Sequence, residues 1–394
     1  MDDAQRVMID AEHVIVGAGC AGLSLAVRLG MRTPRERGRV LLIDPRQELG
    51  GDRTWCMFRG APHPFERAIT HRWDRWRVIA GGRVIERSVP GRPYEHVDST
   101  RFFEEAIARI DASEGVRLER GVSASAIVDE GERVRIETDR GTLRARIAWD
   151  ARGGGPDERP REDDVRWVQH FVGWVVRTER AIFEPGIATL MDFSVSQARG
   201  PHFVYVLPYA ANEALVEDTY FGDVPLAVAE YERGLREWLD AHHAGAVEIV
   251  RRERGQLPMS TAQVAPRRDA RVVPIGLRAG SAKPSSGYAF AFIQRHVEAI
   301  AARVDRGDTV PPEVSVRSPI TTFYDRVFLA YLRRNPTRAP EVFGSLFART
   351  SPERIVRFLS EEGGVTDHLA VMNAVPRLGV MAEIARSRAL WLGR

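Results

Sequence analysis

A glycine-rich turn near the N-terminus limits what this chain can fold into more than any other sequence feature. Gly17, Gly19 and Gly22 form a G-x-G-x-x-G pattern between a strand-like segment, residues 13–16, and a helix-like segment, residues 23–29. Such a turn lets the backbone approach a pyrophosphate closely, and the free N–H groups at the helix start favour its negative charge. The pattern therefore predicts a dinucleotide-binding βαβ unit at the start of an α/β fold.

An acidic residue stands where such a unit uses one. Asp44 ends the next predicted strand, residues 39–44, and lies 22 residues after Gly22. A carboxylate at that position accepts hydrogen bonds from ribose hydroxyls. The alternative, a glycine-rich turn without a ligand, fits this placement less well. The turn alone does not distinguish FAD from a nicotinamide dinucleotide.

Two later segments favour FAD. Asp150 begins an Asp-Ala-Arg-Gly segment that closes a strand, and Gly276 ends a Pro-Ile-Gly segment that is followed by Gly287 at a predicted helix start. Both resemble pieces of flavoproteins of the hydroxylase-like fold, in which the chain returns twice to line the cofactor. Each is a weak signal alone, but their order behind the first motif predicts a flavin-binding lobe.

Length, cysteine content and charge exclude several classes of protein. The 394 residues are enough for two packed lobes, and Cys20 and Cys56 are the only cysteines, so neither a disulfide framework nor a cysteine-based zinc site is expected. The histidines lack metal-binding spacing, so we expect no metal. A net charge of +3 without a nucleic-acid-reading motif argues against a nucleic-acid partner. Residues 14–27 are uncharged, but this segment is shorter than the roughly 20 residues of a membrane-spanning helix. The acidic N-terminal residues do not resemble a secretory signal. We therefore expect a cytoplasmic protein.

Four segments are expected along the chain. Residues 1–155 are predicted to form the cofactor lobe, with a strand insertion near residues 60–95, and residues 156–268 a strand-rich substrate lobe. Residues 269–310 return to the cofactor lobe, and residues 311–394 form a cluster of short helices broken by prolines.

Two acidic positions are candidates for chemistry. Side-chain alternation puts Glu217 on the same strand face as Leu215 and Thr219, while Asp218 points to the other face. A carboxyl group among apolar residues keeps its proton more readily, as a general acid at neutral pH must. Asp192 is a second acid set in an apolar run. The competing interpretation pairs each of these acids with an arginine or exposes it to solvent, and on spacing alone it carries the larger weight.

A set of motifs in chain order resembles the bacterial lycopene β-cyclases. Besides the glycine-rich turn, the matching segments are Asp52-Arg53-Thr54-Trp55-Cys56-Met57-Phe58, Phe171-Val172-Gly173-Trp174, Thr189-Leu190-Met191-Asp192-Phe193, Phe203-Val204-Tyr205-Val206-Leu207-Pro208, Leu215-Val216-Glu217-Asp218-Thr219, Gly255-Gln256-Leu257-Pro258-Met259 and Ala282-Lys283-Pro284-Ser285-Ser286-Gly287-Tyr288. No single motif is specific, but their order along nearly the whole chain is. At position 20 the chain has Cys where the family is expected to have Leu or a small apolar residue. The three glycines of the turn are all present, so this difference does not affect the predicted flavin binding.

The resemblance implies a fold and an activity. The fold is α/β with an α+β second lobe: a Rossmann-like FAD-binding lobe of the hydroxylase-like type, a strand-rich substrate lobe and a C-terminal helical cluster. The activity is an isomerase reaction in carotenoid biosynthesis, in which NAD(P)H reduces FAD and the ψ ends of lycopene, through γ-carotene, close into the β-ionone rings of β-carotene without net redox change. The implied acids are Glu217, Asp218 and Asp192. The implied cofactor contacts are Gly17, Gly19, Gly22, Asp44, Arg53, Asp150, Gly276, Lys283 and Gly287.

Two alternatives to this activity remain open from the sequence. One is a flavin monooxygenase or a polyprenyl or carotenoid reductase on the same fold. The other is a noncatalytic flavoprotein that binds a carotenoid, which the acids in an otherwise apolar lobe disfavour. Lys283, the only lysine of the chain, has two interpretations, a phosphate or flavin contact or survival by chance.

A C40 hydrocarbon substrate implies contact with a membrane surface. Because no spanning helix is expected, the resemblance implies peripheral association with the inner face of the cell membrane. The candidate contacts are apolar residues beside arginines in the C-terminal segment: Phe323, Phe328, Tyr331 and Leu332 near Arg333 and Arg334, and Phe343, Leu346 and Phe347 near Arg349. The alternative, helices packed on the flavin lobe, has at least equal weight.

Overall fold

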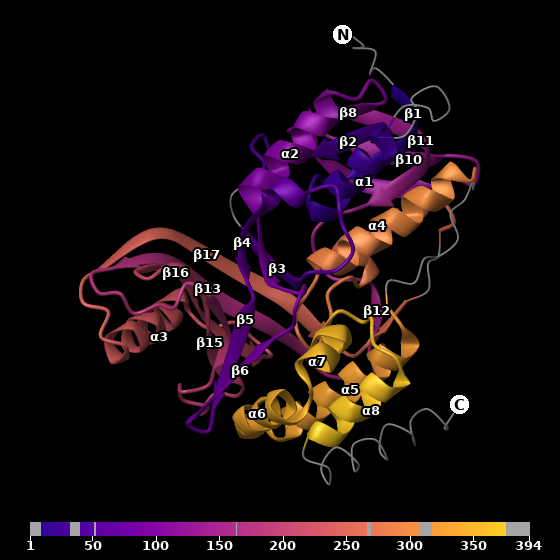
Figure 1. Cartoon of the computed structure of the whole chain (residues 1–394). Coiled ribbons are helices and arrows are strands. Elements are labelled where there is room, and N and C mark those ends of the chain that lie inside the picture. The colour runs from indigo at the N-terminus through magenta and orange to yellow at the C-terminus, as the bar shows by residue number, and fades with distance from the viewer. Residues whose placement is uncertain are drawn as a thin grey trace.

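Two large sheets, joined by smaller elements, organise the molecule (Figure 1). The computed structural model describes residues 9–31, 40–50, 53–162, 164–265, 269–307 and 317–375. Within this part of the chain each of the two large sheets has seven strands.

The first sheet carries the glycine-rich turn. Its strand order is β8 (Val116–Arg120), β2 (Val40–Asp44), β1 (Ile9–Val16), β11 (Gly141–Asp150), β10 (Val134–Thr138) and β9 (Ala124–Asp129), with β19 (Val272–Pro274) also paired to β11. β8, β2, β1, β11 and β19 run parallel, so their carboxyl ends meet at one edge. Ile15 and Leu42 face α1 (Cys20–Gly30), α2 (Ser99–Asp111) and α4 (Phe290–Asp305) in one apolar cluster. The expected βαβ opening is present as β1, α1 and β2.

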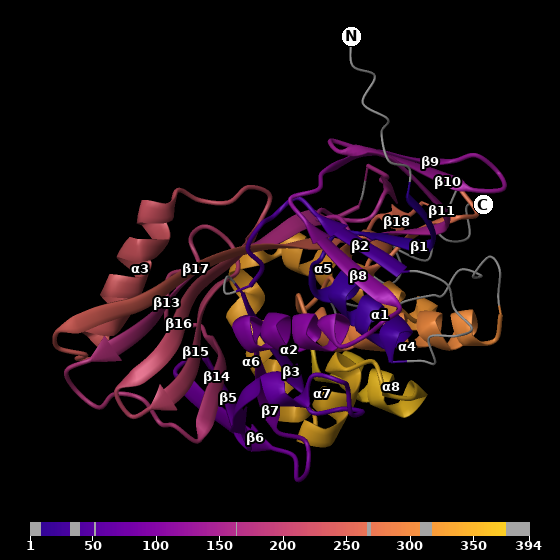
Figure 2. The same cartoon turned by 90° about the horizontal axis from the view of Figure 1, so that it is seen from above.

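The second sheet forms a wide floor. Its order is β17 (Val247–Ser260), β13 (Arg166–Thr178), β16 (Glu213–Gly222), β15 (His202–Ala210), β14 (Ile187–Asp192), β5 (Arg75–Ala80) and β6 (Arg83–Ser88). Neighbouring strands are antiparallel except β14 and β5, which are parallel. α3 (Val228–Ala241) covers one face, where it packs on residues such as Trp174 and Val216 (Figures 1 and 2). The opposite face turns toward the C-terminal helices through residues such as Leu215 and Phe221.

Smaller elements fill the space between the two sheets. β3 (Thr54–Phe58), β7 (Tyr94–Asp98) and β4 (Ile69–Trp73) form a three-stranded sheet, and β12 (Glu158–Arg159) pairs with β18 (Gln263–Val264). The helices α5 (Pro319–Arg334), α6 (Ala339–Arg349), α7 (Pro352–Leu359) and α8 (Val365–Ala374) gather below the first sheet in Figure 1. Prolines in the first turns of α5, α6 and α7 start these helices, since proline needs no backbone N–H donor there. Residues 376–394 of the expected helical segment lie outside the described residues.

The expected strand insertion contributes to the second sheet. β5 and β6 come from residues 75–88, yet they extend the sheet that residues 166–260 form. The limits of the four expected segments stay a prediction, but the chain passes between the two sheets more than once. This interleaving brings β3 and β17 to the same cavity.

Candidate active site

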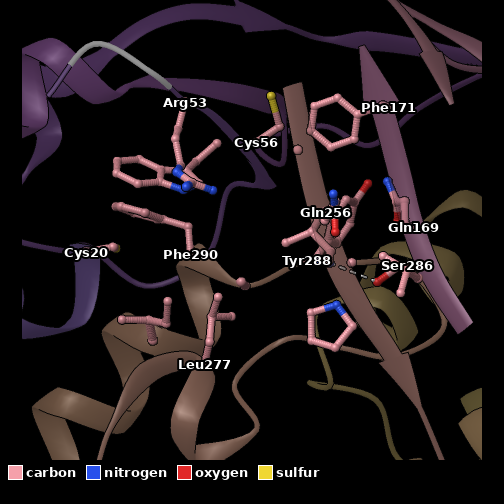
Figure 3. Close-up of a pocket in the computed structure, with 18 of the residues that line it drawn as sticks. Cys20, Arg53, Cys56, Gln169, Phe171, Gln256, Leu277, Ser286, Tyr288 and Phe290 are labelled. Carbon is pink, nitrogen blue, oxygen red and sulfur yellow. Dashed lines mark hydrogen bonds between the residues drawn. The ribbon is translucent and has the colours of Figure 1, made fainter. Parts of the chain in front are cut away.

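A cavity of about 940 Å³ lies between the two large sheets. The glycine-rich turn and the carboxyl edge of the first sheet form one end, β3, β13, β16 and β17 form the middle, and α5 to α8 form the other end. In the close-up, Arg53, Cys20 and Phe290 border one side, and Phe171 and Gln169 of β13 lie across from them (Figure 3). The cavity therefore joins the predicted cofactor end to the sheet that carries the predicted acids.

The three glycines of the turn have different structural roles. Gly17 has a φ of +110°, and a Cβ there would lie 2.7 Å from the carbonyl oxygen of Ala151. A Cβ on Gly22 would overlap the carbonyl oxygen of Gly17. A Cβ on Gly19, the residue that caps the start of α1, would meet nothing within 4 Å because Gly19 borders the cavity. Gly17 and Gly22 close the turn, whereas Gly19 leaves backbone room for a ligand at the helix start.

Asp44 is buried beside this turn and lines the cavity. Its Oδ2 accepts a hydrogen bond from the Ala18 N–H at 2.7 Å, and its Oδ1 accepts one from the Arg46 N–H at 2.9 Å. The Arg46 guanidinium pairs with the same carboxylate at 2.8 Å. Burial raises the pKa of Asp44, but the hydrogen bonds from Arg46 and Ala18 outweigh it, and the pKa is lowered overall. An anionic acceptor therefore faces the predicted ribose position.

The carboxyl end of β11 carries Asp150 next to the turn. Its side chain pairs with Arg152 at 2.8 Å and with Arg278 at 3.5 Å. Arg152 borders the cavity, whereas Asp150 is buried behind it. Asp150 is therefore positioned to orient Arg152 rather than to contact a ligand with its own oxygens.

Two further predicted glycines pack closely around the same end. Gly276 has a φ of +65°, and a Cβ there would lie 2.5 Å from the Cβ of Ala21 in α1. Gly287 has a φ of +71°, and a Cβ there would lie 2.5 Å from Oε1 of Gln169 in β13. Both positions favour glycine by backbone conformation and by space.

The chemical groups at this end of the cavity fit a dinucleotide such as FAD. Gly19 leaves an open position at the start of an 11-residue helix, which suits a pyrophosphate. Asp44 supplies an acceptor for hydroxyl groups, and Arg53 and Arg152 supply donors at the cavity wall. The residues predicted to bind the cofactor are thus brought together, with the exception of Lys283.

Lys283 is buried away from the cavity wall. Its Nζ lies 3.0 Å from Oδ1 of Asp325 and 3.3 Å from Oε1 of Glu361, and Arg317 pairs with both of these acids. Lys283 also lies over the ring of Phe358, 5.1 Å from its centroid. These contacts tie the loop before Gly287 to α5 and to the end of α7, so the lysine has a structural position among the C-terminal helices.

A row of side chains across the second sheet presents Glu217 to the cavity. Glu217 of β16 lies opposite Tyr205 of β15 on one side and opposite Gly173 of β13 on the other. Gly173 in turn lies opposite Glu253 of β17. Glu217 and Glu253 therefore point to the same face on either side of Gly173, and both line the cavity. Burial first, and then the nearby Glu253 carboxylate, hold the pKa of Glu217 well above its ordinary value, against a smaller opposing effect of Arg251.

The adjacent row is aromatic. Phe203, Thr219, Phe171 and Gly255 are register partners across the same four strands and line the cavity. A Cβ on Gly255 would overlap the ring of Phe171, so the glycine gives that ring its place. Aromatic faces next to a neutral acid can stabilise a cation formed there.

Glu253 is a residue that sequence reasoning missed. Its Oε2 accepts a hydrogen bond from the Thr54 hydroxyl at 2.8 Å and pairs with Arg251 at 2.9 Å. Glu253 lies two residues before the Gly-Gln-Leu-Pro-Met motif on the face that alternation shares with Gly255. That position was the only available signal, because its pairing with Glu217 depends on the register of β13.

A group of hydroxyls closes the cavity beside the acids. The Tyr205 hydroxyl donates to that of Tyr94 at 3.0 Å, and Tyr288 and Cys56 line the same wall. Burial raises the pKa of Tyr94, Tyr205, Tyr288 and Cys56, so all four remain neutral. The wall is polar but uncharged.

The other two predicted acids lie behind the sheet. Asp218 is fully buried on the α3 face, where its Oδ1 lies 2.5 Å from Nε2 of His202. Asp192 accepts hydrogen bonds from the Trp238 indole of α3 at 2.9 Å and from the Ser194 N–H at 2.9 Å. Neither acid borders the cavity, so the structure separates them from Glu217. Asp218 points away from the cavity because side chains alternate along β16. Asp192 points away from it because its carboxylate bonds to the Trp238 indole of α3.

The far end of the cavity is apolar and formed by C-terminal helices. Its lining there includes Val327, Phe328, Phe343, Phe347 and Val371. Several side chains considered above for membrane contact are instead buried in the core shared with the second sheet: Tyr331, Leu332, Phe343, Leu346 and Phe347. The helices thus pack on the second sheet rather than exposing these residues. Within the described ranges no helix has the length and apolar character needed to cross a membrane.

Solved structures with the same arrangement of elements define the class of fold. A geranylgeranyl bacteriochlorophyll reductase-like protein from Thermoplasma acidophilum aligns with a TM-score of 0.61 at 14% identity, covering 96% of both chains. The p-nitrophenol 4-monooxygenase PnpA from Pseudomonas putida aligns with a TM-score of 0.57 at 16% identity, covering 97% of this chain and 98% of that one. These likenesses concern the fold alone. The chain has the α/β fold of the flavoprotein hydroxylases and reductases, which confirms the predicted fold class.

Sequence comparison then gives the family. The family model described as lycopene cyclase protein matches residues 12–385, and this chain belongs to that family. It is 28% identical to a lycopene beta-cyclase of Paracoccus sp., covering 92% of this chain and 93% of that protein. It is 26% identical to a lycopene beta-cyclase of Pantoea ananas, covering 94% of this chain and 96% of that protein. The resemblance inferred from the motifs is thereby confirmed, and the chain is a carotenoid cyclase by family.

Proposed function

We propose that this chain is an FAD-dependent lycopene β-cyclase that converts the ψ ends of lycopene and γ-carotene into β-ionone rings without net redox change. The observation that carries the proposal is the position of Glu217. It is a buried carboxyl group with a raised pKa, and it lies between the end of the cavity that the glycine-rich turn forms and the apolar end that the C-terminal helices form. Family membership supplies the substrate class.

Glu217 is proposed to start the reaction as a general acid. An alkene is a poor base, so its protonation needs a neutral acid in a dry site. The Glu217 O–H bond breaks, the proton joins the terminal alkene of the ψ end, and the neighbouring alkene closes the ring. The ring cation then loses a proton, and a C=C bond remains in the ring. The proton count of the enzyme is unchanged over the cycle.

The aromatic row beside Glu217 is proposed to hold the cationic ring. Phe171 and Phe203 line the cavity beside Glu217, and the hydroxyl groups of Tyr94 and Tyr205 add no competing charge. Cation–π contacts of this kind contribute about 0.5–2 kcal/mol each. Reduced FAD, when bound, would add negative charge near the cation. NAD(P)H is the proposed reductant.

The flavin is proposed to lie at the end of the cavity that the first sheet forms. The start of α1 at Gly19 would receive its pyrophosphate, Asp44 its ribose hydroxyls, and Arg53 and Arg152 its remaining acceptors. Asp150 would orient Arg152 through their ion pair.

The apolar substrate is proposed to enter from a membrane surface on the cytoplasmic side. Three apolar side chains on α5 and α8 are exposed: Ile320 at 42%, Val365 at 64% and Leu369 at 53%. They belong to the helices that close the apolar end of the cavity. Peripheral attachment through these helices would give a hydrocarbon a short path to Glu217.

Expression in a lycopene-accumulating bacterium tests this function. The pigments are separated by chromatography and weighed by mass spectrometry, with the Glu217→Gln variant as control. We expect monocyclic or bicyclic carotene of unchanged mass from the native chain, and unchanged lycopene from the variant with its flavin retained. A mass gain of oxygen or hydrogen would support a monooxygenase or reductase instead. Unchanged lycopene with a folded, yellow native protein would support a noncatalytic carotenoid-binding flavoprotein.

A further inference from the structure

We infer that Glu253 is a positioning residue that keeps the reactive proton on Glu217, so that the two carboxyl groups act as a pair carrying one proton. The inference rests on the proposed function and adds a residue to it. The geometry that carries it is the row across the sheet, in which Gly173 separates the two acids. Each of the two glutamates is the register partner of Gly173, one on each neighbouring strand.

Gly173 is what lets the two carboxyl groups share the space. A Cβ at this position would lie 2.8 Å from Cγ of Glu217 and 3.1 Å from Cγ of Glu253. Any other side chain would therefore push the acids apart. Because Gly173 has no side chain, the side chains of the two glutamates lie close together over the strand. Two carboxylates this close cannot both be ionised without a large repulsion, so one proton is retained.

The surroundings decide which of the two acids holds that proton. The Glu253 carboxylate pairs with Arg251 at 2.9 Å and accepts from Thr54 at 2.8 Å. No hydrogen bond to a cation or to a hydroxyl holds Glu217 in the same way among the described residues. The charge is therefore stabilised on Glu253, and Glu217 remains the neutral partner that faces the aromatic row.

Among the residues that the structure describes, the titratable and charged groups around Glu217 come from three strands. Strand β17 contributes Glu253 and Arg251, β3 contributes Cys56, and β15 contributes Tyr205 and Tyr209. The thiol and both phenols stay neutral because burial raises the pKa of each. Glu253 and Arg251 are thus the charges that set the protonation of Glu217, and they act in opposite directions.

The pair also accounts for the return of the proton. When Glu217 gives its proton to the alkene, two adjacent carboxylates face a carbocation. Loss of a proton from the ring cation to Glu217 removes both the cation and the repulsion between the carboxylates. The C–H bond of the ring breaks, its electron pair forms the ring C=C bond, and the Glu217 O–H bond forms again. No oxidant, reductant or outside proton is consumed in this step.

The test compares Glu253→Gln with the native holoenzyme by two measurements. The first is the pH profile of kcat for cyclisation, and the second is the infrared band of a neutral carboxyl group, which Glu217→Gln identifies by its loss. We expect the basic limb of the profile, and the pH at which the band disappears, to move down by at least about one pH unit. Glu248→Gln, a change on an exposed residue of the same strand, is the matched control and should move neither.

A second variant keeps the inference testable if Glu253→Gln does not fold. Arg251→Gln removes the opposing charge, so the basic limb and the infrared titration should move up instead of down. The inference would be overturned if the basic limb of the kcat profile and the pH at which the infrared band disappears were the same in folded Glu253→Gln or Arg251→Gln as in the native chain. If the native chain does not cyclise lycopene, the proposed function fails, and the infrared titration alone still decides whether Glu253 controls the proton on Glu217.

Discussion

Glu217 and Asp218 are consecutive residues of β16, and their carboxyl groups lie on opposite faces of the same sheet. Glu217 faces the cavity, whereas Asp218 faces α3, where Gly234 leaves room for it. A Cβ on Gly234 would lie 2.7 Å from Oδ2 of Asp218. Two adjacent acids are thus separated into one that can reach a substrate and one that fastens a helix to the sheet.

Amide substitutions should distinguish these two positions. Glu217→Gln removes the proposed proton donor, and we expect the cyclisation rate to fall by about 10²–10⁴-fold with the fold retained. Asp218→Asn weakens the buried contact with His202, and we expect a loss of about 1–3 kcal/mol in the free energy of unfolding with near-native activity per folded molecule. Denaturant unfolding and turnover on the same samples measure both. Comparable losses of activity in the two variants would contradict the assignment.

The stability of the protein should depend on pH through Glu217. The unfolded chain releases this proton in the ordinary glutamate range, whereas the folded chain keeps it to higher pH because its pKa is raised. Folding therefore takes up a proton in that window, and stability falls as the pH rises through it, by up to about 1.4 kcal/mol per pH unit. Thermal unfolding across pH gives the Tm of the native chain and of Glu217→Gln. The two Tm values should be similar at pH values below the window, and above it the Tm of the variant should be the higher.

Alanine at two of the turn glycines should have opposite consequences. Gly19→Ala puts a methyl group into open cavity, so we expect a folded protein with FAD affinity reduced tenfold or more. Gly22→Ala drives a Cβ into the carbonyl of Gly17, so we expect little folded protein at all. Circular dichroism reports the fold, and titration of the apoprotein with FAD reports the affinity. Native FAD affinity in Gly19→Ala would place the pyrophosphate elsewhere.

Lys283 offers a test of a buried ion cluster. Among the described residues, Lys283→Met leaves Arg317 as the cation paired with Asp325 and Glu361, and breaking a buried pair in this way costs about 3–5 kcal/mol. We expect a lower Tm and an unchanged FAD affinity in the folded fraction, because Lys283 does not line the cavity. Lys283→Arg retains the charge and should recover part of the stability. Weakened FAD binding with native Tm would restore the phosphate-contact interpretation.

The glycine-rich turn and its βαβ unit could be predicted from sequence because their determinants are local. Gly17, Gly19, Gly22 and Asp44 act within one βαβ unit, and the spacing of that unit is visible in the chain itself. The alternation of Glu217 with its neighbours was likewise a local property, and the structure places Glu217 on the cavity side.

The rest of the site depended on contacts that sequence spacing does not encode. Glu253 lies 36 residues after Glu217 and meets it only through the register of β13. Asp192 and the indole of Trp238 are joined only because α3 packs on the back of the sheet. Lys283, predicted near the cofactor from its neighbouring helix start, is drawn instead to two acids from the C-terminal segment.

The parallel pairing of β14 with β5 has a consequence for recombination among members of this family. Strands from residues 75–88 complete a floor that is otherwise built after residue 166, while β19 returns to the first sheet after residue 271. No single crossover point can therefore exchange the second sheet as a unit between two homologous genes. A chimera that takes this whole sheet from one parent and the first sheet from the other needs at least four junctions, and a single junction between residues 88 and 187 pairs β5 of one parent with β14 of the other.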